Sequence, residues 1–334
     1  MKMFEYKKQL AKDLNCDINE LIDFSSSINF LKPNINIDFN SLDTSVSPNY
    51  EKLNKKISNN YNLNINQFEL FNGHSSSIFA LFKYLNLTHC TLYSPINMKY
   101  KKACINFGYQ LRTINRFEDI YLPVKADSLI VFLNPSFPDG KYYDMEKLIA
   151  YWKEQNCTIL IDESFLPFCE GESCIKYLNN YEKIYILKSL TKFYGSDGVN
   201  VSLLISTIQN IEKLKRFETS WKISIFDVNY LQSAFEDRSF KSISKAINLK
   251  NKIELEKILK SSNLVDEVFD SNVNYFLIKL KNITAKEFQE KLKTFKILVE
   301  NCSDFDFLDE NYMKISVKDS KSNKTLKEAF EKIC

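Results

Sequence analysis

The chain has 334 residues and a formal net charge of +3, because 45 basic residues are nearly balanced by 42 acidic ones. That balance argues against a dedicated nucleic-acid surface, and no apolar stretch approaches the roughly 20 residues that a membrane-spanning helix needs. Hydrophobic residues make up 44% of the chain and aromatic residues 14%, which is enough for a large single core or two domains.

The cysteines and histidines do not form a metal-binding pattern. Eight cysteines include no CxxC pair, and the only histidines are His74 and His89. We therefore expect no metal site. Several cysteines lie in apolar runs and are interpreted as small core residues. With no recognisable signal peptide, the predicted compartment is the reducing cytoplasm.

The first two thirds of the chain alternate between apolar strands, polar loops and helices. Continuous apolar runs predict strands over residues 91–95, 128–135, 157–163 and 183–189. Unbroken rather than alternating apolar runs indicate strands buried on both faces. Helical spacing over 142–156 supplies a connecting helix. The pattern predicts an α/β fold with a parallel sheet and right-handed crossovers.

Near residue 206 the pattern changes to mostly helical sequence, followed by short strands. The expected strands cover 275–280, 296–301 and 312–317, and the expected helices cover 284–295 and 324–333. This arrangement predicts a smaller α+β domain, joined to the first by long helices.

Polar residues follow three of the predicted strands, at the sheet edge where ligands bind in open parallel sheets. Asn134 ends one strand, Asp162 ends the next, and Ser189 with Lys192 follows the third. In the segment 71–85, a glycine turn opens a helix with three serines in its first turn. Free amides and the helix dipole make such a turn a natural phosphate site.

A lysine, a carboxylate and a phosphate site at one sheet edge suit pyridoxal phosphate. This cofactor needs a lysine for its Schiff base, an Asp against its ring nitrogen and a cup for its phosphate. Lys192 and Asp162 are the candidates for the first two roles, and Ser189 and Ser75 for the third.

Each feature also has a simpler interpretation. Lys192 could be a solvated surface lysine, Asp162 a helix cap, and Asn134 the support of a turn before proline. For His74 we favour an exposed turn residue over a ligand role. The order of the four features, each at a strand end or a helix start, is what favours the cofactor.

Several motifs carry a family resemblance in the same order along most of the chain. They are "DFSSSINFLKP" (23–33), "FNGHSSSIF" (71–79), "SPINMKY" (94–100), "NPSFPDG" (134–140), "DESFLPF" (162–168), "KSLTKFYGSDGVNV" (188–201), "KILVENCSDF" (296–305) and "YMKISV" (312–317). Together they resemble fold-type I PLP-dependent enzymes of the class I/II aminotransferase superfamily. Within it the sequence is most similar to the branch that holds histidinol-phosphate aminotransferase and threonine-phosphate decarboxylase.

The resemblance implies the aspartate aminotransferase-like fold, a PLP-dependent transferase fold with a mainly parallel sheet in a large domain and a small α+β C-terminal domain. We expect an N-terminal segment (1–40) that belongs to the small domain and the site, a large domain (41–235) and a small domain (236–334). It also implies a homodimer with sites at the interface.

The resemblance assigns roles to individual residues. Lys192 would be the catalytic Schiff-base lysine, and Asp162 would pair with the pyridine nitrogen. The phosphate would be held by Ser75, Ser189 and the amides of Gly73 and His74. Asn97 would occupy the position that stacks on the cofactor ring, and Asn29 and Lys314 would bind substrate.

Several positions depart from the family pattern. Phe137 replaces the cofactor-binding Asn, Asn97 the stacking aromatic residue, and Asn200 the phosphate-binding Arg. On the substrate side, Glu300 and Lys314 replace arginines. Lysine attracts a carboxylate as a point charge rather than as a bidentate fork.

Three hypotheses follow. The first is a PLP-dependent aminotransferase or amino-acid-phosphate decarboxylase-like enzyme that acts on a small amino compound through Lys192. The alternative is a non-catalytic or repurposed protein on the same fold that binds PLP weakly or not at all. A third is a different enzyme that uses the same cleft without PLP.

Overall fold

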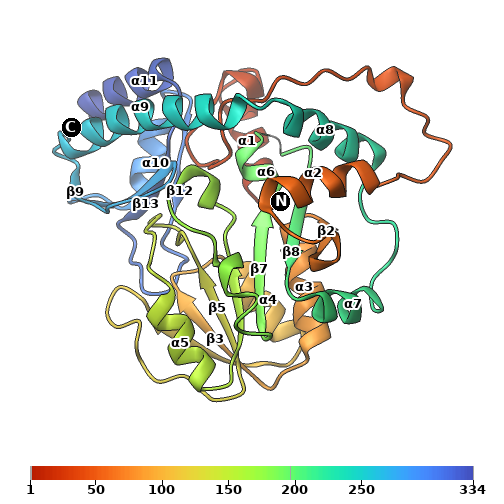
Figure 1. Ribbon diagram of the computed structural model, residues 1–334. Coiled ribbons are helices and arrows are strands. Elements are labelled where there is room, and N and C mark those ends of the chain that lie inside the picture. Colours follow the sequence, from red (N-terminus) through yellow and green to blue (C-terminus); the bar gives the residue numbers. More distant parts are fainter. Residues whose placement is uncertain (1, 196, 334) are drawn as a thin grey trace.

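The large domain is built on a seven-stranded sheet. The computed structural model describes residues 2–195 and 197–333, and its largest sheet has the strand order β2-β8-β7-β6-β5-β3-β4 (Figure 1). β8 runs antiparallel to β2 and β7, and the remaining pairs are parallel. The strands are β2 (Phe68–Asn72), β3 (His89–Ser94), β4 (Gln110–Asn115), β5 (Leu129–Leu133), β6 (Thr158–Asp162), β7 (Ile184–Ser189) and β8 (Val201–Ile205).

Helices cover both faces of this sheet, which explains the unbroken apolar strands. Alternate residues of β6 point into two separate cores, Ile159 and Ile161 into one and Leu160 into the other. The first core is closed by α2 (Glu51–Tyr61), α5 (Glu146–Glu154) and α8 (Ile225–Glu236). The second is closed by α3 (His74–Leu85), α4 (Met98–Asn106) and α7 (Ile208–Lys215). The predicted mainly parallel α/β architecture is confirmed.

Three strands of the large sheet did not stand out from the sequence. β4 is an edge strand, and its first three residues, Gln110, Leu111 and Arg112, are exposed. An edge strand with polar residues lacks the apolar run that marked the central strands. β2 and β8 are apolar but short. β2 leads into the predicted phosphate-binding turn at 71–79, and β8 follows the predicted lysine segment at 188–201.

The small domain is a four-stranded antiparallel sheet, β12-β13-β10-β9, packed against three helices (Figure 1). Its strands are β9 (Val265–Val268), β10 (Tyr275–Leu280), β12 (Glu300–Asn301) and β13 (Tyr312–Ser316). Its helices are α9 (Phe240–Lys260), α10 (Ala285–Lys293) and α11 (Ser320–Ile333). The predicted strand over 296–301 is divided into β11 (Ile297–Leu298) and β12.

The N-terminal segment packs with the small domain. β1 (Ile22–Asp23) pairs in parallel with β11, and Phe24 is buried in the core of the small domain. Before it lies α1 (Lys2–Asp13), and α6 (Leu190–Phe193) follows β7. The 3₁₀ helices are Ile18–Glu20, Phe39–Ser41, Ile65–Gln67, Leu166–Phe168 and Cys174–Tyr177. The domain boundaries near residues 40 and 235 stay a prediction.

Over the described ranges 2–195 and 197–333, no helix has both the length and the apolar character required to cross a membrane.

Candidate functional site

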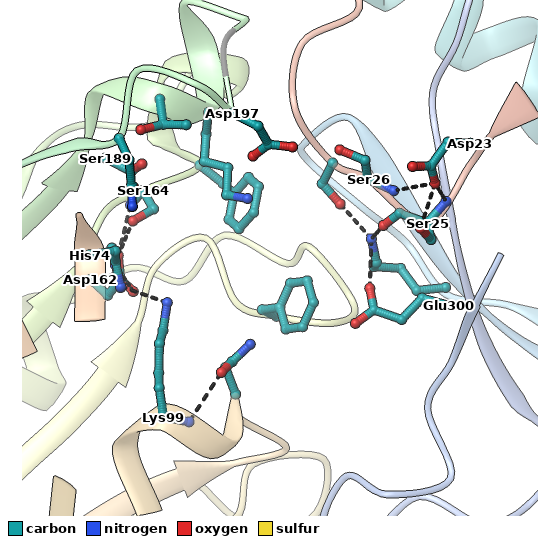
Figure 2. A pocket seen from close by; sticks show the side chains of 18 of the residues that line it. Asp23, Ser25, Ser26, His74, Lys99, Asp162, Ser164, Ser189, Asp197 and Glu300 are labelled. Carbon is teal, nitrogen blue, oxygen red and sulfur yellow. Dashed lines mark hydrogen bonds and ion pairs between the residues drawn. The ribbon is translucent and has the colours of Figure 1, made fainter. Parts of the chain in front are cut away.

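A cavity of about 630 Å³ lies where the carboxyl ends of β6 and β7 face the small domain. It is bordered by the start of α3 and α4 on one side, and by the N-terminal segment, β12 and β13 on the other (Figure 2). Of the residues predicted for the site, those that line the cavity are His74, Asn97, Asp162, Ser189, Lys192 and Lys314. The predicted convergence of strand ends on one edge therefore holds for Asp162, Ser189 and Lys192.

Asn134, the third strand-end candidate, has a different environment. Its amide forms a reciprocal pair with the backbone of Tyr143, with both N–O distances at 2.9 Å. It is buried and is not among the residues that border the cavity. The simpler interpretation, that Asn134 holds the turn before Pro135, fits this geometry.

Asp162 is a buried carboxylate at the end of β6, and both of its oxygens have partners. Oδ1 accepts hydrogen bonds from the Ser164 amide (3.0 Å) and hydroxyl (2.5 Å), and Oδ2 accepts one from the Tyr100 hydroxyl (2.5 Å). Burial acts to raise the pKa of Asp162, but His74, Lys99 and Ser164 hold this pKa well below its ordinary value. Asp162 is therefore a fixed negative charge at neutral pH.

His74 and Lys99 lie beside this carboxylate. His74 Nε2 is 2.9 Å from Asp162 Oδ2, and Lys99 Nζ is 2.6 Å from His74 Nδ1 (Figure 2). Because an ammonium only donates, Nδ1 is the acceptor, which assigns the ring proton to Nε2, facing Asp162. His74 is thus not the exposed turn residue that we favoured, since its side chain is 13% exposed and points into the cavity.

Lys99 was missed by the sequence analysis. It lies in the first turn of α4, whose N-cap is Asn97, and the Asn97 side chain accepts a hydrogen bond from the Lys99 amide (3.1 Å). The predicted stacking position, Asn97, thus serves as a helix cap. Burial lowers the pKa of Lys99 to about 8; Asp162 opposes this shift and Lys192 adds to it.

Lys192 lies in α6, directly after β7, and its side chain reaches the same cavity. Burial lowers its pKa, and the carboxylates of Asp197, Glu300 and Asp162 oppose that shift, whereas Lys314 adds to it. A lysine with a lowered pKa has more of the neutral amine that nucleophilic chemistry requires.

Asn29 supports the lysine segment from behind and is not a lining residue of the cavity. Its backbone amide donates to the Lys192 carbonyl (2.9 Å), and its side-chain amide donates to the Phe193 carbonyl (2.9 Å) and the Ser244 hydroxyl (2.7 Å). The structure places Asn29 where it can hold Lys192 rather than touch a substrate.

The start of α3 has the geometry of an anion cradle. Gly73 is its N-cap with a φ of 87°, and a Cβ atom there would lie 2.4 Å from Asn200 Nδ2. Only glycine suits both the positive φ and the close approach. The first-turn amides of a helix lack intrahelical partners, and buried Ser189 completes this side of the cavity. Ser75, also in this turn, is exposed and does not line the cavity.

Two aromatic rings form an apolar wall. Phe137 and Phe165 are stacked with centroids 6.0 Å apart and planes at 10°, and both border the cavity. The backbone behind Phe137 is held by Arg116, whose Nη2 donates to the Phe137 carbonyl (2.9 Å) and pairs with Asp139 (2.6 Å). This wall can shield an aromatic ligand from water.

The small-domain side of the cavity carries Lys314, which has no free donor and whose Nζ lies 5.5 Å from the centroid of the Phe137 ring. Its ammonium donates to the Ser25 carbonyl (2.7 Å), the Ser27 hydroxyl (2.5 Å) and the Ser316 hydroxyl (3.1 Å). Nζ also lies 3.0 Å from Glu300 Oε2, and the Lys314 side chain is 1% exposed. The predicted carboxylate-binding lysine is therefore already paired with a carboxylate of its own chain.

These residues fit pyridoxal phosphate in part. Asp162, Lys192, Ser189 and the amides of α3 supply a carboxylate, an amine and an anion cradle around one cavity. A donor at position 137 and an aromatic ring at position 97 are missing. The stacked phenyl rings provide apolar shielding instead.

The family model for aminotransferase class I and II matches residues 110–333. The adenosylcobalamin biosynthesis bifunctional protein CobDQ of Leptospira interrogans is 28% identical over 350 residues, which cover 97% of this chain and 40% of that protein. A putative threonine-phosphate decarboxylase of Caldanaerobacter subterraneus is 30% identical over 234 residues, 68% of this chain and 60% of that protein. The chain thus spans about half the length of these two relatives.

Solved structures share the fold. Histidinol-phosphate aminotransferase from Clostridium acetobutylicum superposes with a TM-score of 0.84 at 24% identity, over 94% of this chain and 99% of that one. The histidinol-phosphate aminotransferase of Sinorhizobium meliloti, solved in complex with pyridoxal-5'-phosphate, has a TM-score of 0.80 at 13% identity, over 98% and 95% of the two chains.

Proposed function

The chain belongs to the class I and II aminotransferase family, as its motifs predicted, and from this premise we propose that it is a PLP-dependent aminotransferase or decarboxylase-like enzyme acting on a small amino compound. Family membership supports the predicted cofactor, pyridoxal 5'-phosphate. The observation that carries the proposal is that Lys192 and Asp162 line one cavity together with Ser189.

In the proposed site, the cofactor supplies an aromatic electron sink for the bond broken at the substrate carbon. Asp162, held ionised by its neighbours, keeps a proton on the ring nitrogen. Ser189 and the first-turn amides of α3 bind the phosphate. Phe137 and Phe165 exclude water from the ring.

Lys192 has two proposed tasks. Its amine would hold the cofactor when it is bound. The same amine carries a proton at the substrate carbon, a role favoured by its lowered pKa. Asn29, bonded to the Lys192 carbonyl, positions the segment.

An absorption titration with pyridoxal phosphate tests the proposal. We expect a new band above the protein absorbance in the wild type, absent in Lys192→Ala and in the charge-retaining Lys192→Arg. Borohydride reduction followed by peptide mass mapping should place the label on Lys192. A wild type with no band at millimolar cofactor, or a label elsewhere, would contradict the proposal.

A second candidate is a repurposed protein that binds the cofactor weakly or not at all. The contacts of Asp162 with His74 and Tyr100 favour it, because they already provide partners for the carboxylate that the ring nitrogen needs. The same titration separates the two candidates, because the second predicts no saturable band.

We also propose a homodimer in the cytoplasm. Large aromatic side chains are exposed next to α7 and α8, with Phe217 at 70% and Trp221 at 64% exposure. Exposed apolar groups of this size are typical of association surfaces. Light scattering of the purified protein should give twice the mass of the chain.

A further inference from the structure

The charges that line the cavity are balanced. Among the described lining residues, the cations are lysines and the anions are carboxylates: Lys7, Lys99, Lys192, Lys314, Asp23, Asp162, Asp197 and Glu300. None of the chain's arginines borders the cavity. The cavity therefore offers neither a surplus cation nor a guanidinium fork, which is the group best suited to phosphate and carboxylate.

Most of these lysines have partners within the chain. Lys314 is paired with Glu300 and bonded to three other oxygens. Lys7 Nζ lies 3.5 Å from Asp23 Oδ2, and Lys99 contacts His74 beside Asp162. An acidic substrate would have to displace Asp23 to gain the cation of Lys7, or Glu300 to gain that of Lys314.

Glu300 keeps an oxygen that a ligand can reach, unlike Asp23 and Asp162, whose carboxylate oxygens all have partners. Asp197, the other accessible carboxylate, is exposed at the edge of the cavity. Its side chain is 24% exposed and lines the cavity. The pair with Lys314 uses Oε2, and Oε1 makes no hydrogen bond or ion pair with any residue in the described ranges. Figure 2 shows Glu300 across the pocket from Asp162 and Lys99, so it faces the space between the two walls.

The proposed cofactor adds further negative charge. Its phosphate would enter a cavity whose lysines and carboxylates already cancel. Two unit charges about 4 Å apart interact by several times the thermal energy near a protein surface. A second phosphate would therefore be repelled, whereas a cation would restore the balance.

We propose, building on the proposed function, that the substrate is an amine of net positive charge without a phosphate group, and that Glu300 selects it by pairing with its second cationic group. This class differs from the phosphate esters after which a similar threonine-phosphate decarboxylase and a similar histidinol-phosphate aminotransferase are named. The motif resemblance predicts a substrate-binding arginine at this position, so Glu300 would reverse the sign of the charge offered to the ligand.

Calorimetric titration of the purified full chain, with and without pyridoxal phosphate, tests the substrate class. The probes are 1,4-diaminobutane, O-phospho-L-threonine and L-histidinol phosphate. We expect the diamine to bind, and Glu300→Gln to weaken it roughly 10- to 100-fold, as loss of a charge-assisted hydrogen bond predicts. Glu170→Gln, a change at a glutamate whose side chain is 89% exposed, is the matched control and should bind like the wild type.

Two results would overturn the inference: tighter binding of either phosphate ester than of the diamine to the wild type, or no binding of the diamine. A gain of phosphothreonine binding in Glu300→Arg would support it independently, and circular dichroism confirms that each variant is folded. Failure of the proposed function can be told apart from failure of this inference. The first would appear as a missing absorption band, or as a band that does not depend on Lys192. The second would appear in the heat of ligand binding, which is measured both with and without the cofactor.

Discussion

The two walls of the cavity differ in what their charged groups do. On the sheet wall, Asp162 ends one buried strand and Lys192 follows another, and both are residue types that the motif resemblance predicts there. On the small-domain wall, Glu300 and Lys314 stand where the motif resemblance predicts arginines, and they pair with each other. On the first wall the charged groups remain directed at the cavity, whereas on the second the cation is neutralised by a carboxylate of the same chain.

The largest loss of stability is expected when the ion pair between Arg116 and Asp139 is broken, because Arg116 also holds the backbone of Phe137 at the cavity. Arg116 and Asp139 are 2% and 3% exposed. Arg116→Met leaves a buried carboxylate without its cation, so we expect a loss of about 4 kcal/mol in the free energy of unfolding. Urea denaturation measures it. In Arg116→Met/Asp139→Asn the stranded charge is removed, and most of the loss should be recovered; equal losses in the two variants would refute this account.

Removal of the charge of Asp162 tests the chemical role of the same wall. Asp162→Asn keeps the size of the side chain but cannot hold a proton on a ring nitrogen. Loss of a charged hydrogen-bond partner contributes about 3 kcal/mol, so pyridoxal phosphate affinity should fall roughly 100-fold. Absorption titration measures the affinity. Asp197→Asn, at an exposed carboxylate of the same cavity, should change it far less, and similar losses would argue for a general charge effect.

Breaking the ion pair of the small-domain wall should lower the free energy of unfolding by less than breaking the Arg116–Asp139 pair. Lys314→Met removes an ammonium with four polar contacts, but Glu300 is partly exposed and can be hydrated. We expect a loss of about 2 kcal/mol in the free energy of unfolding. A double-mutant cycle with Glu300→Gln should give a coupling of about 1 kcal/mol. Zero coupling would show that the serine contacts alone hold Lys314.

The strand ends were predictable because parallel strands bring their carboxyl ends to one edge, whatever the loops do. That rule, with the buried apolar runs before Asp162 and Lys192, predicted that these two side chains lie at the same edge. The same apolar runs predicted the fold. They did not predict β4, because an edge strand needs no apolar face.

The partners of those side chains could not be predicted in the same way. Whether His74 turns outward or toward Asp162 depends on the reach of Lys99 from a helix that begins 24 residues later along the chain. The pairing of Glu300 with Lys314 depends on the register of β12 and β13, where these two residues are directly opposite. Motif positions specify residue types, whereas pairings arise only when separate elements pack.

The smallest expected effect concerns Lys99, a lysine of the sheet wall that contacts His74 beside Asp162. Burial lowers its pKa to about 8 in the folded chain, whereas an unfolded lysine titrates near about 10.4. Between these values the unfolded chain binds more protons, so raising the pH through this window stabilises the folded state. Lys99→Met lacks this contribution.

The wild type should therefore gain about 1 kcal/mol relative to Lys99→Met between about pH 8 and about 10.4, a value reduced from the full shift because the Lys99 residue is only half-buried. Urea denaturation across that range measures the difference. Lys318, whose pKa is also lowered to about 8 by burial despite the opposing charge of Asp23, remains in both proteins and cancels. A constant difference across the window would mean that Lys99 is hydrated, and that its contact with His74 does not desolvate the ammonium.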